Sequence, residues 1–164
     1  MHKPLVRTTP IPRLTPEPFR PCRVDPQIRS ITLTKVGGMK NKIQVSFDVY
    51  NNGSTAWRSG ANQQNVTLCV RNGSTGAVYT VTRALPAGAP AGGRMLTFTT
   101  PVIPNAFDTF EFSGTVDVQI SYDPDIAIDG NKCNDDTNSA NNRREISARM
   151  VQAFLGETRS SRTY

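Results

Sequence analysis

The sequence predicts an all-β protein, an antiparallel β-sandwich of about seven strands preceded by an extended proline-rich N-terminal arm. Three observations support this. From about residue 28 onward, apolar and polar residues alternate with a period of two; clusters of Gly, Asn, Ser and Pro separate these runs; and no long helical pattern interrupts them. One-sided alternation is typical of antiparallel sheets with one wet face, and seven short strands at this spacing indicate an immunoglobulin-like sandwich.

The expected strands cover residues 27–36, 42–50, 66–70, 77–82, 94–100, 114–122 and 143–152. The second is the clearest, because Ile43, Val45, Phe47 and Val49 all fall on one face of an extended chain. In the last expected strand, the side chains of Ile146, Ala148 and Met150 are expected to point inward. Trp57 follows the turn Asn51–Ser54 and is expected to plug one end of the sandwich, with an exposed binding aromatic as the alternative.

The chain divides into an arm over residues 1–27, a sandwich over 28–152 and a basic C-terminal tail over 153–164. Seven of the twelve prolines lie in residues 1–29, and proline favours an extended path over a helix or a sheet interior. Apolar and basic residues punctuate the arm, and we expect them to bind a groove or a neighbouring sheet edge, with a loose tail as the alternative. These residues are Leu5, Val6, Arg7, Ile11, Arg13, Leu14, Phe19 and Arg20.

The net charge of +6 is unevenly placed. Residues 1–29 carry +4 and residues 143–164 carry +3, whereas residues 30–142 carry −1. Basic ends suit an acidic partner surface or a nucleic acid, although they also serve as solvated tails. The basic start has no apolar stretch behind it, so we expect synthesis without a signal peptide, and no apolar run is long enough to span a membrane.

The three cysteines, Cys22, Cys69 and Cys133, are widely spaced. An odd count without a Cys-x-x-Cys pair favours reduced, structurally inert thiols. A Cys22–Cys133 bridge, which would pin the arm to a loop, stays open because sequence cannot give the distance.

No catalytic constellation is present: the single histidine, His2, lies in the arm, and no glycine-rich phosphate loop opens a helix. We therefore expect no enzyme and no cofactor. The polar stretch 123–142 holds carboxylates of the kind that calcium prefers, and Asp123, Asp125 and Asp129 are the candidate ligands. The spacing does not match an EF-hand, and the favoured alternative is that Asp and Asn cap turns.

Three segments occur in the order seen in CARDB-like domains, the cell-adhesion-related modules of bacteria and archaea: 48–56, 85–98, and 117–125 with the closing Ala140-Asn-Asn. The sequence resembles this family over roughly residues 28–152. The resemblance implies an immunoglobulin-like sandwich with a surface binding or adhesion role and with no catalytic residues to carry over.

We expect a non-enzymatic structural or interaction protein that its arm anchors to protein neighbours, in multiple copies, within a large assembly. A virion structural or decoration protein fits these features, located in a virion or another extracellular assembly. The first alternative is a cell-surface or secreted adhesion module. The second is nucleic-acid binding through the basic tails, which their few aromatic residues, Phe19, Phe154 and Tyr164, do not favour.

Overall fold

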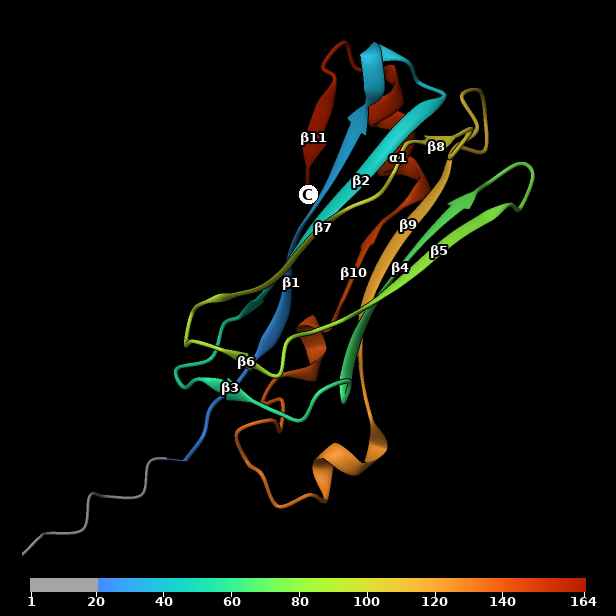
Figure 1. Ribbon diagram of the computed structural model, residues 1–164. Helices are drawn as coiled ribbons and strands as arrows, with labels where there is room; N and C mark the ends of the chain where they lie inside the picture. The colour runs from blue at the N-terminus through green and yellow to red at the C-terminus, as the bar shows by residue number, and fades with distance from the viewer. Residues whose placement is uncertain (1–20) are drawn as a thin grey trace, which may run out of the picture.

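The computed structural model describes residues 21–164, which form two antiparallel β-sheets packed face to face (Figure 1). The first sheet contains, in spatial order, β11 (Ser161–Thr163), β1 (Pro26–Lys35), β2 (Lys42–Asn51) and β7 (Arg94–Thr99), with β8 (Ile103–Pro104) also pairing with β2. The second contains β10 (Arg143–Ile146), β9 (Gly114–Tyr122), β4 (Gln64–Asn72) and β5 (Val78–Ala84). Two short strands, β3 (Trp57–Arg58) and β6 (Gly88–Ala89), form a separate ribbon.

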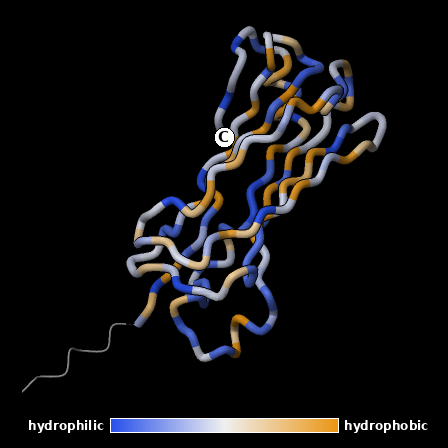
Figure 2. The backbone as a smooth tube through the Cα atoms, viewed as in Figure 1, coloured by the Kyte–Doolittle hydropathy of each residue, from blue (hydrophilic) through white to orange (hydrophobic). Residues whose placement is uncertain are grey.

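The core lies between the two sheets because alternate residues of each strand point inward. In β2 the four residues Ile43, Val45, Phe47 and Val49 are buried, and in β4 and β9 the same alternation buries every second residue. Figure 2 shows the hydrophobic segments running along these facing strands. Burial of aliphatic side chains contributes roughly 1.5–3 kcal/mol each, so these rows are the main source of stability. The expected all-β, antiparallel, sandwich-like fold is confirmed at this level.

A strand overlaps each of the seven expected ranges, and Trp57 is fully buried, as expected for a plug. Four strands of two or three residues, β3, β6, β8 and β11, bring the total to eleven among residues 21–164. These short strands carry too few residues to show a period in the sequence.

The last expected strand is wrong in its second half. β10 ends at Ile146, and the chain continues as helix α1 (Ala148–Gly156). The helix buries Val151, Phe154 and Leu155, which are spaced as one face of a helix. Ala148 and Met150, expected to face inward, are exposed instead.

The expected C-terminal tail, residues 153–164, also differs from the structure. It contributes the end of α1 and then β11, which pairs antiparallel with β1 from Thr32↔Thr163 to Thr34↔Ser161. The final residue, Tyr164, exchanges two backbone hydrogen bonds with Ile31. This segment therefore protects an edge of the first sheet.

The sandwich begins earlier in the chain than the sequence predicts. Val24 is fully buried and Asp25 nearly so, and β1 starts at Pro26, before the expected boundary at residue 27. The eight arm residues named as partner contacts all lie in residues 1–20, outside the described residues.

Lys35 ties the first sheet to α1. Its side chain is only 4% exposed, and its Nζ donates hydrogen bonds to the carbonyl oxygens of Phe154, at 3.1 Å, and Glu157, at 2.6 Å. The Phe154 carbonyl also accepts the N–H of Glu157, so Lys35 adds a charged donor at the C-terminal end of the helix, where a cation is favourable.

We predict that Lys35→Met lowers the free energy of unfolding by about 1–3 kcal/mol, because two carbonyl groups lose a charged donor. Lys42→Met, at an exposed position of β2, is the matched control and should change the free energy by less than about 0.5 kcal/mol. Urea denaturation of both variants measures the difference. Equal stability of the two variants would show that Lys35 does not hold the helix.

Candidate functional site

The segment 123–142 joins β9 to β10 at the lower end of the sandwich in Figure 1 and forms the largest irregular part of the described chain. It contains two 3₁₀ turns, η2 (Pro124–Ala127) and η3 (Ser139–Asn141). The N–H of Asp123 donates to the carbonyl of Gln63, and the N–H of Thr137 donates to the carbonyl of Val24. Val24 also forms an isolated parallel bridge with Asp136. The segment is thus held against both sheets.

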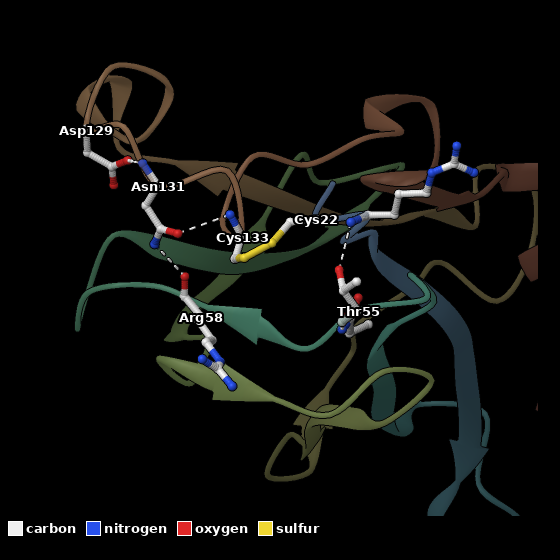
Figure 3. Close-up of a disulfide and its surroundings, with 8 residues drawn as sticks. Cys22, Thr55, Arg58, Asp129, Asn131 and Cys133 are labelled. Atoms are coloured by element: carbon white, nitrogen blue, oxygen red, sulfur yellow. Dashed lines mark hydrogen bonds between the residues drawn. A yellow bond between two sulfur atoms is a disulfide. The ribbon is translucent and has the colours of Figure 1, made fainter. Parts of the chain in front are cut away.

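A disulfide between Cys22 and Cys133 fastens this segment to the start of the described chain (Figure 3). The two Cα atoms lie 5.0 Å apart, within the usual range for a disulfide. The expectation of reduced thiols is therefore wrong for this pair, because the fold brings together two residues 111 positions apart in sequence. Cys69 lies half-buried on β4 and is not in a disulfide.

Asn131 fixes the loop around the disulfide (Figure 3). Its Oδ1 accepts a hydrogen bond from the N–H of Cys133, and its Nδ2 donates to the carbonyl of Arg58 on β3. The N–H of Asn131 donates to Asp129 Oδ1 at 2.6 Å. One amide thus connects the loop to the β3–β6 ribbon.

The structure does not bring the candidate calcium ligands together. Asp123 Oδ1 accepts the N–H of Asp125 and caps η2, whereas Asp125 is exposed. Asp129 accepts hydrogen bonds from Asn131 N–H and Asn134 Nδ2, and the Asn134 amide is the main cause that lowers the pKa of this carboxyl. Within residues 21–164, no three His, Cys, Asp or Glu side chains are placed to hold a metal ion. For Asp123 and Asp129, turn capping is the role observed.

A cleft of about 400 Å³ opens between the end of β9, η2 and the second half of the loop. Its less polar lining residues are Tyr122, Pro124, Ile126 and Ala127. Its polar lining residues are Asp123, Asn134, Asp135, Asp136, Ser139 and Asn142. The Tyr122 ring stacks at a tilt against the buried Trp57, with centroids 6.1 Å apart, so the apolar wall continues into the core.

Asp136 organises the polar side of this cleft. Its Oδ2 accepts hydrogen bonds from Tyr122 Oη, at 3.1 Å, and Asn142 Nδ2, at 2.6 Å, and its Oδ1 accepts the N–H of Asn138. Burial, together with the charge of Asp136, raises the pKa of Tyr122. The hydroxyl group therefore stays protonated and acts as a fixed donor to the carboxylate.

In the sequence, Asn134 is one of the turn residues of a polar stretch, and Asn142 stands out only as the last residue of the closing Ala140-Asn-Asn; neither is predicted to be buried. In the structure both are buried and line the cleft. Of the carboxylates proposed from sequence, only Asp123 lines the cleft.

Comparisons with models of protein families, with curated proteins and with solved structures find no match. None of the helices in the described part of the chain is long and apolar enough to span a membrane.

We predict that replacing both Cys22 and Cys133 by serine lowers the free energy of unfolding by about 2–5 kcal/mol, because the bridge closes a long loop in the unfolded chain. Cys69→Ser is the control and should cost less than about 1.5 kcal/mol. Thiol titration in denaturant checks the pairing directly: air-oxidised protein should expose one thiol per chain and reduced protein three. Three thiols before reduction would contradict the bridge.

Proposed function

We propose that this protein is a non-enzymatic structural component of a large assembly, a virion structural or decoration protein, in which the sandwich is exposed and the N-terminal arm anchors it to neighbouring proteins. The proposal rests on the difference in composition between two segments of the chain. Residues 1–20 hold five prolines, four basic side chains and, besides Met1, five apolar residues, whereas both sheets and their facing core rows are built from residue 24 onward. Apolar residues in a segment that precedes such a core are suited to bind the surface of a partner protein.

Exposed aromatic residues support a role in protein contacts. Phe110 is 85% exposed and Phe112 is 64% exposed, and both lie in the segment between β8 and β9. Large exposed apolar side chains in close succession are typical of interaction surfaces.

We further propose that the sandwich has immunoglobulin-like topology and is CARDB-like. The strand order supports this: β1, β2 and β7 would correspond to strands A, B and E, and β10, β9, β4 and β5 to strands G, F, C and C′. The segments that carry the CARDB resemblance cover the β2 turn, the β6–β7 region and the end of β9. An architecture of this kind presents loops at both ends and suits binding rather than catalysis.

A cell-surface or secreted adhesion module is the second candidate, and the disulfide is compatible with it. Disulfides persist in oxidising surroundings such as the cell exterior. The exterior of a virion provides the same surroundings, so the bridge supports both candidates over a reducing compartment.

We predict that a chain lacking residues 1–20 folds with its disulfide intact but is not incorporated into its assembly. The cut at residue 20 spares Cys22 and Val24, which a deletion of the full expected arm would remove. A matched variant keeps the arm's length and charge and replaces Leu5, Val6, Ile11, Leu14 and Phe19 by serine; it should lose incorporation as well. Circular dichroism checks folding, and quantitative mass spectrometry of purified particles checks incorporation.

Normal incorporation of the truncated chain would reject the arm as an anchor. Mass spectrometry of native protein from particles and from cell envelopes separates the two candidates. High copy number in particles supports the assembly component, whereas confinement to the envelope supports adhesion.

A further inference from the structure

Strand β5 forms an open edge of the second sheet among residues 21–164. It pairs with β4 on one side and is the last strand in the order of that sheet (Figure 1). At one end of this antiparallel pair the N–H of Asn72 donates to the carbonyl of Ala77. At the other end the N–H of Leu85 donates to the carbonyl of Gln64. The odd-numbered residues of β5 therefore hold the ladder bonds to β4.

The even-numbered residues of β5 turn their backbone N–H and C=O groups away from β4. These residues are Val78, Thr80, Thr82 and Ala84. The Thr82 carbonyl accepts a hydrogen bond from the Arg83 guanidinium at 3.0 Å, and a carbonyl oxygen can accept a second one. The outer side of β5 thus presents a row of alternating donors and acceptors that a further strand could pair with.

The other three edges of the two main sheets are short or interrupted, whereas β5 is neither. β11 has three residues, and β10 has four, of which Arg143, Arg144 and Glu145 are charged. β7 has six residues, and a register shift interrupts its pairing with β2. Short edge strands, charged residues and bulges are the devices by which sheets avoid pairing with another chain. β5 has seven residues in unbroken register with β4.

The side chains of β5 do not protect its edge. The strand has one charged residue, Arg83, and its guanidinium lies over the Phe98 ring of β7, 4.4 Å from the centroid. Val78 is 47% exposed, and Thr80 and Thr82 are exposed as well. Because β-branched residues fit a strand well and no proline interrupts this one, β5 is suited to accept another strand.

The sequence of β5 is complementary to itself. In an antiparallel pair of two copies centred on Val81, every outward-facing residue meets another one, as Thr80 meets Thr82 of the second copy. Arg83 then faces Tyr79, so that like charges do not face each other. Within the chain, the Thr82 hydroxyl already forms a hydrogen bond of 2.9 Å with the hydroxyl of Thr67 on β4. Thr80 of the second copy would extend this row of threonines across the contact.

We propose that two copies of this chain pair through β5, antiparallel and about a two-fold axis at Val81, so that their four-stranded sheets join into one. Such a contact uses the same surface on both copies and closes as a dimer. It goes beyond the proposed function, because it lies on the sandwich and needs no residue of the arm.

Oxidative cross-linking of the full-length chain tests the register. The background is Cys69→Ser, in which Cys22 and Cys133 are bonded to each other. Val81→Cys places two thiols opposite each other in a non-hydrogen-bonded pair, where Cα atoms lie about 4.5 Å apart and a disulfide can form. We expect most chains to become covalent dimers. Thr80→Cys, the control on the same edge, lies two residues away from its own copy and should give at least tenfold less dimer.

Sedimentation velocity measures the dimer without a cross-link. Thr80→Pro removes one outward N–H but no ladder bond to β4, and it should raise the dissociation constant of the dimer at least tenfold. Thr80→Ala keeps the N–H and should change this constant less than threefold. Circular dichroism checks that both variants fold, and the cross-linking result does not depend on the proline variant.

A full-length chain that stays monomeric at millimolar concentration would overturn the proposal, as would equal cross-linking by the two cysteine variants or equal dissociation constants of the two Thr80 variants. Amide hydrogen exchange shows what covers β5. Protection of the Thr80 and Thr82 amides should rise with protein concentration, and protection that is independent of concentration would reject the second copy. If no dimer forms but the chain lacking residues 1–20 is not incorporated, the pairing is rejected and the proposed function stands.

Discussion

The lower end of the molecule depends on one constraint: twenty residues between β9 and β10 must satisfy their backbone without a sheet partner. Backbone carbonyls accept several of the N–H groups of the segment, as Asp123 does for Ile126, and Asp and Asn side chains cap further ones, as Asp129 and Asn131 do around the disulfide. The disulfide and the Val24–Asp136 bridge then hold the segment against β1. Because the side chains are used for this purpose, the carboxylates spread along the loop instead of converging on a metal, and the cleft forms between the parts of the loop that they fix.

Most of the fold could be predicted from the sequence because a period of two survives in every long strand. Successive side chains of a strand point to opposite faces of its sheet. Ile43 and Val45 therefore point to the buried face, and Gln44 and Ser46 point to the other, less buried face. The prediction failed where the period changed within a few residues. Ile146 ends β10 and Val151 belongs to α1. Apolar residues nevertheless continue at every second position, at Ala148 and Met150, and this imitates the pattern of a strand. β11 was missed because three residues beside a helix show no pattern of their own.

The site was less predictable, and the reason is physical. Asn134 and Asn138 both lie near aspartates in a polar, turn-forming stretch, but only Asn134, directly after the disulfide-bonded Cys133, is buried. The contact between residues 22 and 133 is not contained in any local pattern. The arm could be recognised from its prolines, whereas its boundary could not, because Val24 and Asp25 are held by hydrogen bonds from residues distant in sequence, among them Thr137 and Asn141.

The disulfide also fixes the point from which the N-terminal segment leaves the body. It bonds Cys22, at the start of the described chain, to the loop that carries Asn134. An arm that anchors the protein to neighbouring proteins, as proposed, would leave every copy from this same point, whatever surface it binds.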